Sequence, residues 1–123
     1  MRSFLFIFFS FFFFLTLTKS SASEILTVQG QIASVQRYNL VTKPAPYIQF
    51  ILKANDEEFT VDVGPEWYVH SQGLFLIPRE EIEVQGFLIE EEGRKILFAK
   101  EIKQETTTLR IRDESGKPLW GFD

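Results

Sequence analysis

The residues that most resemble a reactive centre lie within nine positions of one another. Asp62, Glu66 and His70, which is the single histidine of the chain, flank the aromatic pair Trp67 and Tyr68. On a helix, Glu66 and His70 would share one face at a spacing where both could touch one metal ion. Stable metal sites use three or four ligands, often several His or Cys, and this chain has no cysteine. We therefore expect no metal or other cofactor, and an exposed ion pair between Glu66 and His70.

The sequence also offers few candidate nucleophiles for covalent catalysis. Ser71 adjoins His70 without a glycine motif of the kind that forms an oxyanion hole. The acidic runs 57–58, 80–81 and 90–92 flank expected turns, where charged side chains are usually solvated. We expect a protein that is not an enzyme, with a paired-carboxylate hydrolase as the alternative left open.

Three features of the local pattern indicate which elements could position these residues. Alternating apolar residues predict five strands, over 24–38, 47–53, 58–63, 80–90 and 95–103, and residues 106–112 form a β-branched sixth strand or an extension of the fifth. Pro65 and Gly73 bracket a short stretch at helical spacing, which predicts one helix over 65–72. A glycine at position 30 and a phase change near Ala33 and Ser34 predict a bent, bulged first strand.

Three strands, a short helix and two or three further strands are the order of an OB-fold. The predicted fold class is therefore all-β, a small OB-fold-like Greek-key barrel with one short helix between strands 3 and 4. An open β-roll or an SH3-like barrel is the alternative.

The first 23 residues have the layout of a secretory signal peptide. Met1 and Arg2 form a basic start, residues 3–17 are an uncharged apolar run, and residues 18–23 are polar with small side chains. This layout predicts cleavage before Glu24, or after Ala22. The alternative is an uncleaved membrane anchor, although the run is shorter than the roughly 20 residues needed to span a bilayer.

The predicted mature domain, residues 24–123, is acidic and contains no cysteine. It has 11 basic and 17 acidic residues, a net charge of −6, because Arg2 and Lys19 lie in the signal segment. Such a charge disfavours nucleic acid and anionic lipid as partners. Without disulfides, the domain must rely on core packing and hydrogen bonds.

Several short segments resemble a known group of proteins. They are Val28–Ile32, Val61–Tyr68, Ile82–Gly86 and Leu109–Asp113, the last with Gly116, Pro118 and Trp120. In these segments the chain is similar to small exported bacterial OB-fold proteins of poorly defined function. The resemblance implies the barrel architecture and a location in the bacterial periplasm or cell envelope. These are motifs of the fold, and they carry no catalytic residues.

The ligand face of an OB-fold usually lies on strands 2 and 3. Their outward positions are expected to be 47, 49, 51 and 53, then 58, 60 and 62, with one lysine among acidic groups, which is a poor track for phosphates. The candidate binding residues are Tyr47, Gln49, Lys53, Thr60, Tyr68 and Trp120.

The two tryptophans are expected to be structural. Trp67 should enter the barrel mouth as part of the helix, so that Trp67→Ala would cost about 3–5 kcal/mol. Trp120 should pin the C-terminal tail over the sheet. If exposed, these rings could instead stack on bases or sugars.

The sequence thus predicts an exported, non-enzymatic binding module that contacts a protein, a peptide or a small envelope ligand. One alternative is a membrane-proximal structural or assembly accessory that keeps its N-terminal anchor. Another is oligosaccharide or oligonucleotide binding through exposed aromatic side chains.

Overall fold

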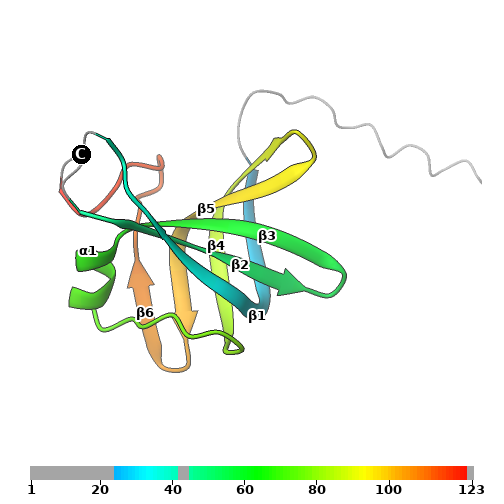
Figure 1. Cartoon of the computed structure of the whole chain (residues 1–123), viewed down its shortest axis with the longest axis horizontal. Helices are drawn as coiled ribbons and strands as arrows, with labels where there is room; N and C mark the ends of the chain where they lie inside the picture. Colours follow the sequence, from blue (N-terminus) through cyan, green and yellow to red (C-terminus); the bar gives the residue numbers. More distant parts are fainter. Residues whose placement is uncertain (1–23, 42–44, 122–123) are drawn as a thin grey trace, which may run out of the picture.

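The structure is a computed structural model that describes residues 24–41 and 45–121. Its elements, in chain order, are β1 (Glu24–Tyr38), β2 (Tyr47–Ala54), β3 (Glu57–Pro65), α1 (Glu66–Ser71), β4 (Glu81–Glu91), β5 (Arg94–Gln104) and β6 (Thr107–Arg110) (Figure 1). The proposed signal segment and its cleavage sites fall outside the described residues. Within the described ranges, no helix has the length and apolar character required to cross a membrane.

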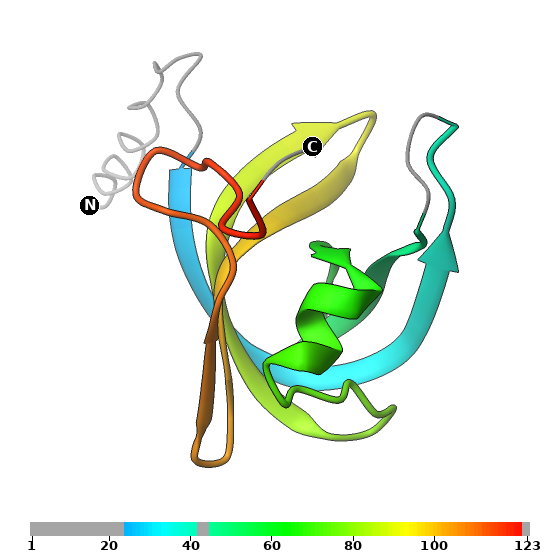
Figure 2. The same cartoon turned by 90° about the vertical axis from the view of Figure 1, so that its left-hand side faces the viewer.

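The six strands form one sheet that closes on itself. Their order is β3-β2-β1-β4-β5-β6, and a short parallel pairing of β3 with β5 completes the barrel. This seam consists of three residue pairs, from Thr60 with Ile96 to Asp62 with Phe98. Figure 2 shows α1 lying across one open end of the curved sheet. The predicted OB-fold barrel, with its helix between strands 3 and 4, is confirmed.

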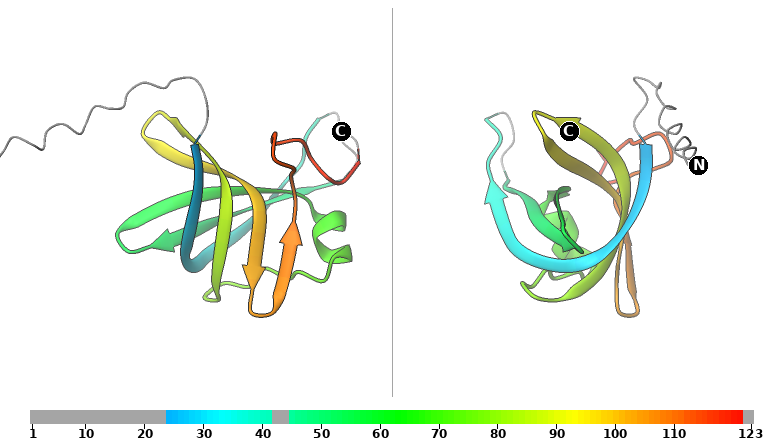
Figure 3. Two further views of the ribbon diagram at one scale, coloured as in Figure 1. Left: turned by 180° about the vertical axis from the view of Figure 1, so that it is seen from behind. Right: turned by 90° about the vertical axis from the view of Figure 1, so that its right-hand side faces the viewer.

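The long strand β1 belongs to both halves of the barrel. Its first part pairs with β4 and its second part with β2, so the strand curves through the sheet (Figure 3). The register slips between Ile32 and Ser34, which confirms the predicted bulge. A side chain at Gly30 would collide with the carbonyl of Lys53, so only glycine lets β2 cross β1 this closely.

Alternation along the strands fills the barrel with apolar side chains. Phe50, Leu52, Val61 and Val63 are fully or almost fully buried, as the sequence pattern predicted. The helical end of the barrel is closed by Val69 of α1 and by Leu74 just after it, both 0% exposed.

The expectation that Trp67 plugs the barrel was wrong. Its side chain is 49% exposed. Successive helical residues are about 100° apart, so Trp67 lies roughly 200° around the helix from Val69. Because Val69 points into the barrel, Trp67 must point away from it.

The C-terminal tail, which we define as residues 111–120, folds back over the outside of the barrel. Ile111 donates a backbone hydrogen bond to Lys100 O, Leu119 donates one to Ile111 O, and Arg112 forms an isolated bridge with Pro118. Trp120 is 7% exposed and lies directly above Gly64, where any side chain would strike its ring. The expectation that Trp120 pins the tail is confirmed.

Candidate functional site

The strand register places two rows of outward side chains across the barrel, which together we call the outer face. One row contains Ile25, Phe87, Phe98, Asp62, Gln49 and Gln36. The next contains Ile89, Ile96, Thr60, Ile51 and Ser34. The outer face is therefore apolar over β4, β5 and the first part of β1, and more polar over β3, β2 and the second part of β1.

The C-terminal tail turns the apolar half into a groove. This apolar groove has a volume of about 530 Å³. It is lined by Ile25, Phe87, Ile89, Phe98, Arg112, Glu114, Ser115 and Gly116. Ile25 is 49% exposed and Ile89 is 41% exposed. Large apolar side chains left open together in this way are typical of a binding surface.

Arg112 lies at the foot of the tail and is buried, with 8% of its surface exposed. Its Nη1 donates hydrogen bonds to Ala99 O of β5, at 2.6 Å, and to Asp62 O of β3, at 3.4 Å. The guanidinium carbon lies 5.7 Å from the Phe98 ring centroid and 5.4 Å from that of Trp120. Arg112 therefore ties the two strands of the seam together, and it also lines the groove.

Asp62 is the acidic group of the outer face that lies beside the seam. Tyr38 Oη donates to its carboxylate, with distances of 3.1 and 3.2 Å to the two oxygens. Burial raises the pKa of Asp62, and the hydrogen bond from Tyr38 and the charge of Arg112 oppose that rise. Burial lowers the pKa of Arg112, and the nearby charge of Asp62 opposes that change. Burial thus disfavours the charged forms of both Asp62 and Arg112, and each charge partly stabilises the other.

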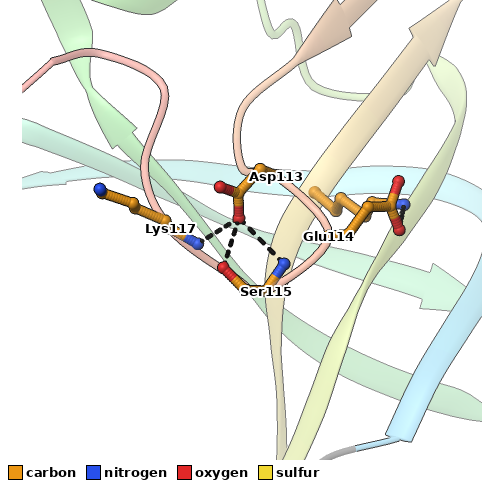
Figure 4. Close-up of polar contacts among 5 residues, drawn as sticks. Asp113, Glu114, Ser115 and Lys117 are labelled. Carbon is orange, nitrogen blue, oxygen red and sulfur yellow. Dashed lines mark hydrogen bonds and ion pairs between the residues drawn. The ribbon is translucent and has the colours of Figure 1, made fainter.

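A tight turn at the start of the tail forms one wall of the groove. Asp113 Oδ1 accepts hydrogen bonds from Ser115 N, Ser115 Oγ and Lys117 N, at 2.9, 2.8 and 2.9 Å (Figure 4). The backbone hydrogen bond from Lys117, followed by those from Ser115, lowers the pKa of Asp113. The adjacent Glu114 forms an ion pair with the mostly buried Lys100 at 2.9 Å. These contacts fix the wall to the barrel.

The structure gathers only some of the candidate residues from the sequence. Gln49 and Thr60 lie in the polar half of the outer face, and Gln49 Nε2 donates to Gln36 Oε1 at 3.1 Å. Lys53 is exposed, and its Nζ lies 3.8 Å from Glu58 Oε2. Tyr68 lies apart from them on α1, where its hydroxyl donates to Arg110 O at 3.1 Å.

Tyr47 and Trp120 are not open to a ligand. Alternation does direct Tyr47 outwards, but the tail lies on that side, and the Trp120 ring packs edge-on against it with centroids 6.0 Å apart. Tyr47 is therefore 9% exposed, and the expectation that it forms part of an open ligand face was wrong.

The expected pair of His70 and Glu66 is present on the surface of α1. His70 Nε2 lies 3.9 Å from Glu66 Oε2, which also binds Arg37 at 2.8 Å. Across residues 24–41 and 45–121, no three His, Asp or Glu side chains gather closely enough to hold a metal ion.

Sequence reasoning missed both the groove and Arg112. Arg112 stands two positions after Arg110, so strand alternation would expose both. Arg112 is buried only because residues 113–120 return across it, and no local pattern signals that return.

Comparison with known proteins identifies the family. The model of a family described as the MamS/MamX magnetosome protein family matches residues 24–109, well over half of the chain. This chain belongs to the MamS/MamX magnetosome protein family. No curated protein matches the chain. The family match ends at Leu109, so the tail of this MamS/MamX protein lies beyond it.

A solved structure shares the barrel. It is the small single-stranded DNA-binding protein from Streptomyces coelicolor, with a TM-score of 0.52 and 15% sequence identity. The match covers 71% of this chain and 96% of that one. At this identity the likeness demonstrates a common fold, and it supports the OB-fold part of the resemblance found in the sequence.

Proposed function

We propose that this MamS/MamX protein is an exported, non-enzymatic binding module of the magnetosome that holds a segment of a partner protein in the apolar groove. The observation that carries the proposal is the groove itself. Four large apolar side chains, two of them more than 40% exposed, lie open beside a wall that hydrogen bonds and an ion pair hold in place. A preformed apolar surface of this kind binds without paying an ordering cost of its own.

The composition of the groove favours a protein partner over a nucleic acid. Arg112 and Glu114 are its charged residues, one of each sign, so it offers no row of cations for successive phosphates. The similar Streptomyces protein is described as binding single-stranded DNA, but that likeness concerns the fold. A non-enzymatic role fits the outer face, where the side chains that could titrate are held in hydrogen bonds that join the tail, β1 and the seam.

Site-specific photo-crosslinking in cells that produce the full chain tests this proposal. A photoreactive phenylalanine analogue placed at Ile25 should yield a defined crosslinked partner. The same analogue at Thr108, an exposed position of β6 outside the groove, should not.

Two substitutions distinguish binding in the groove from nonspecific hydrophobic contact with the surface. In the protein that carries the photoreactive analogue at position 25, Ile89→Glu places a charge among the apolar side chains of the groove. This substitution should abolish the crosslink. Adding Thr108→Glu should leave it unchanged. Equal crosslinking from both probe positions, or a product that survives Ile89→Glu, would contradict a role for the groove.

A further inference from the structure

We infer that the apolar groove captures the carboxyl terminus of a partner polypeptide, with the terminal carboxylate on Arg112 and apolar last residues over Phe98, Phe87 and Ile89. The inference rests on the proposed function and specifies its ligand. Capture of a chain terminus is a known mode of peptide recognition.

The first argument is the state of the charge on Arg112. The side chain is buried, and among the described residues it forms no ion pair. Its hydrogen bonds go to two neutral carbonyls, and its faces lie on two aromatic rings. The charge of Asp62 acts on the guanidinium, but the Asp62 carboxylate accepts from Tyr38 Oη and forms no direct ion pair with Arg112 among the described residues. A buried cation without a direct ion pair is costly, and a ligand carboxylate would offset that cost.

The second argument is the supply of hydrogen-bond donors on Arg112. A guanidinium has five N–H donors, and the protein uses only Nη1 among the contacts of the described residues. Arg112 lines the groove, and none of its atoms is among the buried polar atoms left without a partner. The remaining donors are therefore not sealed off without a partner, and because Arg112 lines the groove, a ligand carboxylate there could accept two of them at once.

The third argument is the balance of charge and donors near Arg112. Glu114 is the acid of the groove, and its carboxylate is held by Lys100 Nζ at 2.9 Å. Trp120 Nε1 is the one buried side-chain polar atom of the described residues that lacks a partner, and its ring lies against Arg112. The Asp62 carboxylate is likewise held by Tyr38 Oη, so neither nearby carboxylate bonds to the guanidinium, and the complementary ligand group is an anionic acceptor.

The fourth argument favours a chain end over an acidic side chain within a chain. Beyond Arg112 the space over the barrel is filled, because Trp120 packs against the guanidinium, Tyr47 and Gly64. Trp120 thus closes the groove on the side of Arg112, and a peptide that lies over Ile89 and Phe98 would meet Arg112 on that closed side. The groove volume of about 530 Å³ suits a few residues of such a peptide.

Fluorescence anisotropy with two matched peptide pools tests the inference on the full-length exported protein. Both pools are labelled hexapeptides with mixed Val, Leu, Ile and Phe at the last three positions. One pool ends in a free carboxylate and the other in an amide. We expect the free-acid pool to bind about tenfold more tightly, as a charge-assisted contact provides.

Three variants complete the design. Ile89→Glu should weaken both pools, while Thr108→Glu should change neither. Arg112→Gln should remove the preference for the free acid, with circular dichroism to confirm that it folds. If Arg112→Gln does not fold, the comparison of the two pools on the wild-type protein still decides.

The outcomes separate this inference from the proposed function. If both pools bind equally and Ile89→Glu weakens both, capture of a carboxylate is overturned while the groove remains a peptide site. If neither pool binds, the inference is overturned and the crosslinking result decides the proposed function independently. A preference for the free acid that persists in a folded Arg112→Gln protein also overturns it.

Discussion

Trp120 and Trp67 differ in what surrounds their rings. Trp120 lies between Tyr47 and Tyr68, with centroid distances of 6.0 and 6.2 Å, and covers Gly64. Trp67 contacts the edge of Tyr68 at 5.9 Å and is half open to solvent. Only the first ring removes most of its apolar surface from water, so only the first should contribute strongly to stability.

Replacing each tryptophan by alanine tests this difference. Trp120→Ala should lower the free energy of unfolding by about 3–5 kcal/mol, because it empties a large buried site. Trp67→Ala should lower it by no more than about 1 kcal/mol, as expected for a largely exposed residue. Urea denaturation of both variants measures the values. A reversed order would place Trp67, and not Trp120, in the core.

Asp62 should make the stability of the protein depend on pH. Burial raises its pKa in the folded state above the ordinary value of 3.8. Between these two pKa values the folded protein holds more protons than the unfolded chain, so stability falls as the pH rises through that interval. Asp62→Asn cannot titrate and keeps an acceptor for Tyr38, so this part of the decline should disappear. Denaturation curves recorded from about pH 4 to about pH 7 check it; curves that stay parallel to the wild type would refute it.

Single residues show where sequence reasoning succeeded and failed. Phe50 and Val61 were predicted correctly because period-two alternation fixes the face of a strand residue. Trp67 was misplaced because a six-residue helix has too few apolar positions to define its buried side. Tyr47 was misjudged and Arg112 was missed because a distant segment covers both, and alternation carries no information about such a cover.

The elements themselves were easier to predict than their packing. The bounds of β1 agree with the sequence prediction, and the bulge and the helix lie where the pattern placed them. Glycine, proline and changes of phase are local signals, so the element ends and bulges that they mark can be predicted from the sequence. The groove could not be predicted from local sequence, because it forms between the tail and strands that lie far from the tail in the chain.

The turn that begins the tail depends on one carboxylate, and Asp113→Ala tests it. Asp113 Oδ1 accepts three hydrogen bonds from Ser115 and Lys117, so the variant should loosen the wall of the groove. Hydrogen exchange at the amide of Leu119, which bonds to Ile111 O, should become faster. Asp113→Asn retains an acceptor oxygen and should exchange more slowly than Asp113→Ala. Unchanged exchange in both variants would mean that other contacts hold the tail.

At the level of the entire protein, the fate of the first 23 residues decides whether the barrel is free or tethered. If they act as a signal peptide and are cleaved, the barrel is released from the membrane. A retained apolar segment would keep β1 beside a membrane, since residue 24 begins that strand. The two cases correspond to a diffusible binding module and to a membrane-proximal accessory.

Mass spectrometry of the intact protein purified from its native host distinguishes the two cases. We expect a chain that starts at Glu24 or Ser23, because residues 1–23 have the layout of a signal peptide. A mass that includes residues 3–17 would instead support the membrane-proximal accessory.

The hydrogen bonds from Arg112 across the seam set the order in which the protein can be completed. Its Nη1 reaches carbonyls of both β3 and β5, which are joined by only three residue pairs. A chain emerges from the ribosome, or from an export channel, with its N-terminus first. Strands β1 to β5 can thus have emerged before Arg112, which bonds β3 to β5, has been synthesised or exported. The hydrogen bonds that tie β3 to β5 through Arg112 can therefore form only after residue 112 has emerged, and until then the seam is held by its three residue pairs.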